Sequence, residues 1–165
     1  MLTDIEITNL IECKKRIVVP PKKSMTLQSG HFKNDMEIES LDKEHKFRVF
    51  MRKCSTFHEN FTIGLDYISN SIPNSIILFR CNGMHGNHHN DWSNPNIEHH
   101  SHYHIHIAKE ENIVNNLKPE RYAEITGEYS TFDDALEYFL KKCNIIDKNN
   151  YFYKYNQISI FEDVK

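Results

Sequence analysis

Three segments of the sequence alternate between two kinds of side chain at a period of two residues. Residues 46–52 and 60–67 alternate apolar with mostly polar residues, and residues 102–108 alternate histidine with apolar residues. Successive side chains of a β-strand point to opposite faces of its sheet, whereas a helix repeats its faces about every 3.6 residues. The segments therefore predict β-strands. The short gap at 53–59 favours antiparallel pairing of the first two.

A fourth strand and two helices complete the predicted fold. Residues 75–81 are apolar at nearly every position, which indicates a strand inside the sheet. Residues 3–16 and 131–143 carry helical apolar stripes behind a capping Thr or Ser, so each predicts a helix. Residues 22–45 predict one or two short strands. We expect an α+β fold, in which an N-terminal and a C-terminal helix pack on one face of an antiparallel sheet of four to six strands. The four principal strands lie at about 46–52, 60–68, 75–81 and 102–108.

The length and composition indicate one folded domain over residues 1–165. Hydrophobic residues make up 39% of the chain, and the formal net charge is −3 with histidine neutral. This balance excludes a global basic field of the kind that attracts nucleic acid, so any such attraction must be local. The four cysteines are scattered without a Cys-x-x-Cys pair, which favours free thiols in a reducing compartment. The acidic N-terminus is unlike a signal peptide, and no apolar run approaches the roughly 20 residues of a membrane span. We therefore expect a cytoplasmic protein.

The strongest candidate for a functional site is the histidine row of residues 102–108. In a strand, His102, His104 and His106 share one face, roughly 6.6 Å from neighbour to neighbour. Imidazole is the side chain best suited to exchange protons near neutral pH, so the row is a candidate for acid–base catalysis. Alternatively, His104 and His106 could ligate a zinc ion together with His102, His85 or Glu98, which leaves an open position for water. A solvated strand face without chemistry is the plain alternative.

Other candidates lie on neighbouring segments. If residues 75–81 pair with 102–108, Arg80 and Asn82 come close to the histidine row, where Arg80 could hold a phosphate bidentately. Asn82 and Gly83 are also a common turn signal. His85 begins the histidine-rich loop, and the remaining candidates for substrate binding are Arg48 and Arg52 beside Phe50, and the single tryptophan, Trp92. An ordinary solvated face is the alternative for Arg48 and Arg52. The loop histidines His88, His89, His99 and His100 are more simply surface residues.

Two resemblances concern these residues. His102-Tyr-His-Ile-His-Ile-Ala108 resembles the His-x-His-x-His-x-x motif of histidine triad nucleotide hydrolases and transferases. That resemblance implies that His104 attacks the α-phosphate of a nucleotide. The long helix that those proteins carry in mid-chain is absent from the pattern here, where strands are predicted instead.

The second resemblance covers about two-thirds of the chain. Leu78-Phe-Arg-Cys-Asn-Gly-Met-His85, Pro95 and His104-Ile-His106 follow the order of motifs in a family of small bacterial proteins. The layout is also similar to TumE-type toxins of toxin–antitoxin modules, which have an Arg-Tyr-Asp-Asn-Ala-Pro-His segment before a His-His-x-His strand. This resemblance implies a toxin-like or mobile-element protein, an RNA substrate and an antitoxin partner.

Three function classes follow from the sequence. Our leading hypothesis is a toxin-like ribonuclease or related phosphodiesterase that needs no cofactor, with catalytic residues His102, His104, His106, Arg80 and His85. Asn82, Arg48, Arg52 and Trp92 would bind its RNA substrate. The second is a histidine triad-like nucleotide hydrolase or transferase, and the third is a non-catalytic module that binds a protein partner, with or without zinc.

Overall fold

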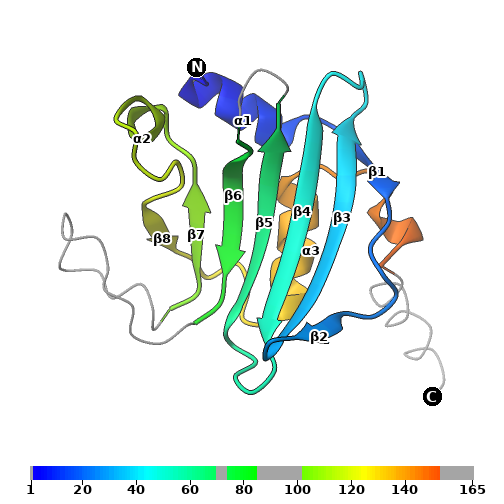
Figure 1. Cartoon of the computed structure of the whole chain (residues 1–165). Coiled ribbons are helices and arrows are strands. Elements are labelled where there is room, and N and C mark those ends of the chain that lie inside the picture. The colour runs from blue at the N-terminus through cyan, green and yellow to red at the C-terminus, as the bar shows by residue number, and fades with distance from the viewer. Residues whose placement is uncertain (1, 70–73, 85–101, 153–165) are drawn as a thin grey trace, which may run out of the picture.

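The computed structural model describes residues 2–69, 74–84 and 102–152. Within these residues, eight strands form one sheet in the order β1-β3-β4-β5-β6-β7-β8, with β2 paired to β3 off this path. Figure 1 shows the long central strands β3 to β6 side by side. All strand pairs in the sheet are antiparallel. The strands are β1 (Lys15–Val19), β2 (Thr26–Gln28), β3 (His31–Ser40), β4 (Lys46–Cys54), β5 (Phe61–Ile68), β6 (Ile76–Asn82), β7 (His104–Ile107) and β8 (Ala123–Ile125).

The expected α+β class is confirmed, but the sheet is larger than four to six strands. The strands predicted at 46–52, 60–68 and 75–81 are present as β4, β5 and β6. β6 lies between β5 and β7, as expected for a strand that is apolar on both faces. The extra strands are β1, whose first two residues were predicted to lie in the N-terminal helix, and the short edge strand β8. β3 is ten residues long, longer than the short strands predicted in that region.

The first helix, α1 (Asp4–Glu12), begins as predicted and ends earlier. The Thr3 side chain accepts the backbone N–H of Glu6, and the Glu6 carboxylate accepts the N–H of Thr3, which completes a capping box. The prediction that the helix continues to residue 16 is wrong. Cys13 leaves the helical conformation, and Lys15 already pairs with β3. The backbone of Lys15 is therefore part of the sheet.

The C-terminal helix, α3 (Phe132–Lys142), matches its prediction closely. Thr131 caps it by accepting the N–H of Asp134, and Lys141 and Lys142 lie in its last turn. The buried stripe comprises Ala135, Leu136, Phe139 and Leu140. Between β7 and α3 the chain forms a short helix, α2 (Glu110–Val114), and a 3₁₀ turn, η2 (Lys148–Asn150), follows α3.

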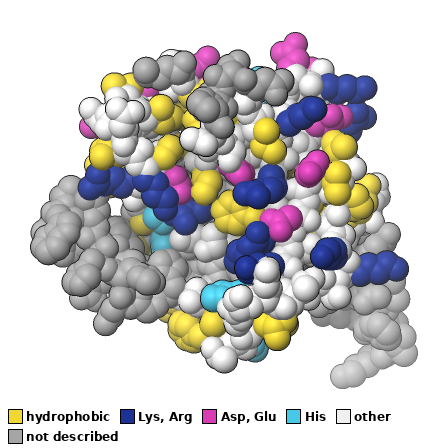
Figure 2. All heavy atoms as spheres, in the orientation of Figure 1, with side chains coloured by type: hydrophobic (Ala, Val, Ile, Leu, Met, Phe, Trp, Pro, Cys, Tyr) yellow, Lys and Arg dark blue, Asp and Glu magenta, His cyan; other side chains and the backbone are white. Residues whose placement is uncertain are grey.

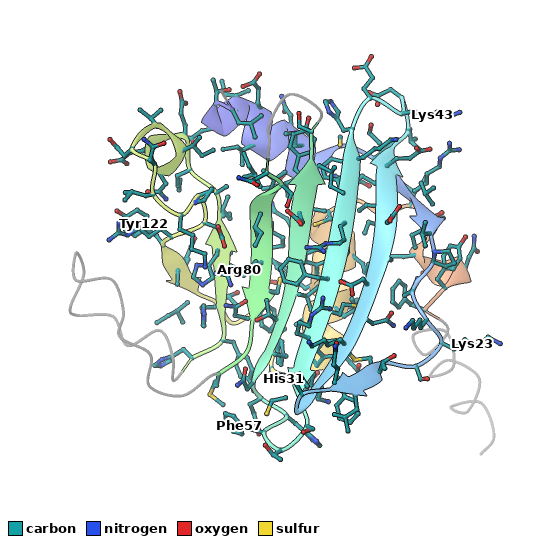
Figure 3. The ribbon with its side chains drawn as sticks, in the orientation of Figure 1. Lys23, His31, Lys43, Phe57, Arg80 and Tyr122 are labelled. Carbon is teal, nitrogen blue, oxygen red and sulfur yellow. The ribbon has the colours of Figure 1, made fainter. Side chains whose placement is uncertain are left out.

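The hydrophobic core lies between the sheet and the helices. Phe47, Val49 and Met51 of β4 are buried and alternate with side chains on the opposite face. Figure 1 shows α3 behind the central strands and α1 across the upper end of the sheet. We call the sheet face opposite to α3 the front face, and it is the face that Figures 1 to 3 present to the viewer. No helix among the described residues is long and apolar enough to cross a membrane.

Candidate functional site on the front face

The pairing of β6 with β7 brings four predicted site residues together. Arg80 lies directly opposite His106, and Asn82 lies directly opposite His104. Phe79, directly before Arg80, stacks on Phe139 of α3, with ring centroids 5.6 Å apart. Because neighbouring side chains on a strand point to opposite faces, Arg80, Asn82 and the two histidines belong to the front face. Figure 3 shows Arg80 there on β6.

The cross-strand register extends this group into two rows across the sheet. One row runs Lys33, Arg52, Thr62, Asn82 and His104, and the next runs Asp35, Phe50, Gly64, Arg80 and His106. Adjacent strands are about 4.8 Å apart, so each row places its side chains within reach of their neighbours. The predicted Arg52 and Arg48 thus share a face with the histidines, but they lie three strands away on β4.

His104 is held in one orientation by two hydrogen bonds and is almost fully buried. Its Nδ1 lies 2.9 Å from the carbonyl oxygen of His102, and its Nε2 lies 3.2 Å from the Nδ2 of Asn82. A carbonyl oxygen only accepts, so we assign the proton to Nδ1 and the lone pair to Nε2. This tautomer allows the Asn82 amide to donate to Nε2. The hydrogen bonds at its two nitrogens fix the orientation of the imidazole.

His106 differs from His104 in its electrostatic environment. Burial, and after it the positive charge of Arg80, lower the pKa of His106 to about 2. The two imidazole rings meet edge to face, with centroids 5.1 Å apart. The Nδ1 of His106 is buried and has no hydrogen-bond partner among the described residues. His106 is thus neutral at physiological pH and unsuited to the role of general acid.

Arg80 is a largely buried cation beside the histidines, and most of its hydrogen-bond donors are unused by the described residues. Its Nε lies 3.4 Å from Oε1 of the buried Glu120, close enough for an ion pair but without hydrogen-bond geometry. Lys118 approaches the same oxygen at 3.2 Å. Burial lowers the pKa of Arg80, yet a guanidinium stays charged at any physiological pH. In the described part of the chain, no hydrogen bond involves its two terminal nitrogens.

Arg48 and Arg52 are already matched by carboxylates. Arg48 pairs with the buried Asp66 at 2.9 Å, and Arg52 pairs with Asp35 at 2.9 Å. Arg52 also donates to the backbone oxygens of Asn34 and Met51. These pairs reduce the attraction of both arginines for a phosphate. Figure 2 shows basic and acidic side chains interspersed around hydrophobic ones on the central part of this face.

The aromatic ring of Phe50 lies across the neighbouring strand. A Cβ atom added to Gly64 would come within 2.2 Å of this ring, so the ring rests directly on the glycine backbone. Phe50 is only partly buried, and the Arg52 guanidinium lies 5.8 Å from its ring centroid. The face therefore presents a fixed aromatic surface between Arg52 and Arg80.

The interpretation of Asn82 and Gly83 as a turn is wrong. Asn82 is the last residue of β6, and Gly83 donates its N–H to the carbonyl of Phe61 at 2.9 Å. Gly83 is required by close packing, since an added Cβ would lie 1.8 Å from the backbone oxygen of Glu59. The buried Tyr129 then closes this end of the strand pair. Its hydroxyl accepts the N–H of Asn82 at 3.0 Å and donates to the carbonyl of His104 at 2.7 Å.

The structure separates the remaining candidates from this group. His102 precedes β7, which begins at His104, and its side chain is exposed. The predicted three-histidine strand row is therefore reduced to His104 and His106. His85, Trp92, Glu98 and the loop histidines lie outside the described residues. Within the described ranges, no three His, Cys, Asp or Glu side chains are grouped so as to hold a metal ion.

A family model matches residues 2–145 of the chain. The chain belongs to a family of unknown function, DUF6978. The residues matched to DUF6978 extend from α1 through α3, so they include the whole front face with β6 and β7. No curated protein and no solved structure shows significant similarity to the chain. The chemistry of this DUF6978 member must therefore be argued from its own side chains.

Several residues of the site had no signal in the sequence. Glu120 follows Lys118 and Pro119 in a segment that indicates only a turn, yet it is buried against Arg80. Tyr129 precedes the cap of α3 and gave no sign that its hydroxyl binds two strands. Phe50 opposite Gly64 could have been found, because an aromatic residue often covers a glycine across a strand pair. That inference needs the register, which the alternation alone does not give.

Proposed function

We propose that the protein is a metal-independent, toxin-like ribonuclease that binds single-stranded RNA on the front face and uses His104 for proton transfer. One observation carries the proposal: an imidazole oriented by hydrogen bonds at both nitrogens lies beside a partly buried arginine with unused donors. A base and a cation near one phosphate are the minimum that such a reaction needs. The front face supplies both on adjacent strands.

The chemistry assigns a separate role to each side chain. In metal-independent RNA cleavage, the 2′-oxygen attacks the adjacent phosphorus, its proton passes to a base, and the bond to the 5′-oxygen breaks. Nε2 of His104, which carries the lone pair, accepts the proton after the 2′-hydroxyl displaces the Asn82 amide. The terminal nitrogens of Arg80 bind the phosphate oxygens as their charge grows. His106 is a neutral imidazole at neutral pH and is not available as an imidazolium acid. The acid that protonates the leaving 5′-oxygen must therefore come from outside the strand pair, and the exposed His102, two residues before His104, is our candidate.

The resemblance to TumE-type toxins supports the toxin part of the proposal. A toxin-like nuclease is held inactive by a partner antitoxin, and we expect that partner to be encoded beside the gene. Co-expression of the neighbouring gene product should yield a stable complex in which RNA cleavage is suppressed. A neighbour that neither binds nor inhibits the protein would remove the toxin–antitoxin part and leave the nuclease part to its own test.

The nuclease proposal is tested by RNA cleavage in the presence of EDTA. Purified wild-type protein should cleave single-stranded RNA, and His104→Gln should reduce the rate about 100-fold or more, the range for loss of a general base. Glutamine keeps a side chain that can bond to Asn82, so the variant should fold, which circular dichroism checks. The exposed His58 provides the matched control, since His58→Gln should cleave at the wild-type rate. Intact RNA under all conditions with wild-type protein would refute the proposal.

The geometry of His104 also suits the histidine triad alternative. An imidazole with its proton fixed at Nδ1 presents the Nε2 lone pair, as a nucleophile requires. In that case a nucleoside phosphoramidate or dinucleotide should leave a phosphorylated His104, detectable by mass spectrometry after an acid-free quench. A covalent intermediate without RNA cleavage would favour this alternative. Stoichiometric zinc in active protein would instead favour the metal-site hypothesis, and a protein that binds a partner without either activity would favour a binding module.

A further inference from the structure

An open groove lies at the lower end of the front face, next to the candidate site. It has a volume of about 330 Å³ and is lined by His31, Phe50, Arg52, Asn60, Phe61 and Thr62. Figure 3 shows His31 at this end of the sheet and Arg80 higher on β6. The volume falls at the small end of ligand sites in proteins. The groove therefore fits a small group rather than a large ligand.

The lining of the groove combines an aromatic surface with unused polar groups. The ring of Phe50 is fixed by its contact with Gly64, so it can accept a stacked ring without first being ordered. The side chains of Asn60 and Thr62 are half-buried, and neither makes a hydrogen bond within the described residues. An amide and a hydroxyl can each donate and accept. Stacking and edge-on hydrogen bonding are the two interactions that proteins use for unpaired bases.

The charges of the groove favour a neutral group. Its one arginine, Arg52, is compensated by Asp35 at 2.9 Å and by two backbone oxygens. A phosphate would have to displace these contacts. Arg80, by contrast, has terminal donors without hydrogen bonds in the described structure and lies opposite Gly64, on which the Phe50 ring rests. Thr62 and Arg80 are diagonal neighbours on paired strands, about 7–8 Å apart, a separation comparable to that between the base and the phosphate of one nucleotide.

We propose that the groove is a nucleobase subsite, in which one base of single-stranded RNA stacks on Phe50 and its edge bonds to Asn60 and Thr62. The phosphate of the same nucleotide lies at Arg80, beside His104. This inference rests on the proposed function for the identity of the strand. It adds the position of a base and the residues that bind it.

The subsite is tested by equilibrium binding of a fluorescent 2′-O-methyl oligonucleotide, which lacks the attacking hydroxyl and cannot be cleaved. Phe50→Leu should weaken binding about tenfold, the loss expected for one stacked base, whereas Phe50→Tyr should bind like wild type. Tyr151, an exposed aromatic residue after η2, gives the control variant Tyr151→Leu, which should also bind like wild type. Removal of the bases from the oligonucleotide should lower its affinity for wild-type protein by the same factor. For Phe50→Leu, which has already lost the stacked base, the same removal should change the affinity little.

A second readout uses the thiol of Cys54. Cys54 lies opposite His31, and hydrogen bonds from Thr56 lower the pKa of its thiol to about 7, so it should react readily with iodoacetamide at neutral pH. Saturating oligonucleotide should slow this reaction several-fold and leave the rate at Cys13, at the end of α1, unchanged. The binding constant should also vary weakly with salt, with a slope near −0.7 for one phosphate contact.

The outcomes distinguish the subsite from the nuclease. Equal affinities for wild type and Phe50→Leu would overturn the subsite, whatever the cleavage assay shows. Absence of any oligonucleotide binding by wild-type protein at low salt would overturn the subsite and the RNA-binding proposal together. Binding that depends on Phe50, without cleavage of unmodified RNA, would uphold the subsite and refute only the nuclease.

Discussion

The neutrality of His106 has a measurable consequence for stability in acid. Burial and, to a smaller extent, Arg80, His104 and Lys118 together lower its pKa in the folded protein to about 2. An unfolded histidine has a pKa of about 6.5. Below that pH the unfolded chain binds a proton at this position and the folded chain does not. Acid therefore shifts the equilibrium towards the unfolded state, and the stability is lost as the pH falls below about 6.5.

The size of the effect follows from proton linkage. The free energy of unfolding falls by at most about 1.4 kcal/mol per pH unit for one such group. Between pH 7 and pH 5 the loss from His106 alone is about 2 kcal/mol, a large part of the roughly 5–15 kcal/mol that stabilises an ordinary domain. Other groups titrate in the same range, so the prediction concerns the difference between two proteins. The variant His106→Gln, which cannot bind the proton, should lack this loss.

Urea unfolding at pH 5, 6, 7 and 8 measures this difference. The stability of wild type relative to His106→Gln should fall by about 2 kcal/mol from pH 7 to pH 5. The same comparison with His58→Gln should show almost no change, because His58 is exposed. A gap between wild type and His106→Gln that stays constant with pH would refute the reasoning. So would a His106 proton resonance that titrates near pH 6.5, since it would make His106 an acid–base candidate equal to His104.

Two further predictions concern the scaffold. Lys15 is fully buried, and its Nζ donates to the carbonyls of Ile11, Cys13 and Cys143. Lys15→Met should lower the free energy of unfolding by about 3 kcal/mol in urea titrations, because three carbonyls lose their donor. Lys14 is exposed, so Lys14→Met should change it by less than about 0.5 kcal/mol. Equal urea midpoints for Lys15→Met and wild type would contradict this role of Lys15. Gly83→Ala places a Cβ against the Glu59 backbone, so it should lower the free energy of unfolding by more than about 2 kcal/mol. The Cβ of Gly127→Ala meets nothing within 4 Å, so this variant should keep the wild-type stability. A wild-type melting temperature for Gly83→Ala would contradict the close packing at Gly83.

The parts of the fold that could be predicted from the sequence are those in which neighbouring residues carry the signal. The alternation in residues 46–52 and 60–68 marks one buried face, and both segments are strands. The cap at Thr3 and the cap at Thr131 are set by a few residues each and were also predicted. The strand β1 was missed for the opposite reason. A lysine among other basic residues indicates a solvated surface. Lys15 is buried because its Nζ is enclosed by carbonyls of both the end of α1 and the distant end of α3.

The candidate site shows the same division. That Arg80 and Asn82 lie near His104 and His106 depended mainly on whether two neighbouring strands pair, so the sequence could anticipate the cluster. The exact partners, Arg80 with His106 and Asn82 with His104, come from the register of the two strands. It could not distinguish the two histidines, because the difference lies in the charges around each ring. Glu120 and Lys118 reach the site from the segment after α2, and no local pattern marks a contact across forty residues of chain.

The charge pattern of the front face explains why a protein with net charge −3 can still be proposed to bind RNA. Each exposed arginine of β4 is matched by a carboxylate on an adjacent strand, so the face offers little long-range attraction to a polyanion. Arg80 keeps unused donors because its partner Glu120 contacts only Nε. One phosphate contact and one stacked base then supply most of the affinity, which makes binding weak, local and nearly independent of salt. A surface of this kind selects a single strand, because in a duplex the base faces are stacked on each other and cannot reach Phe50.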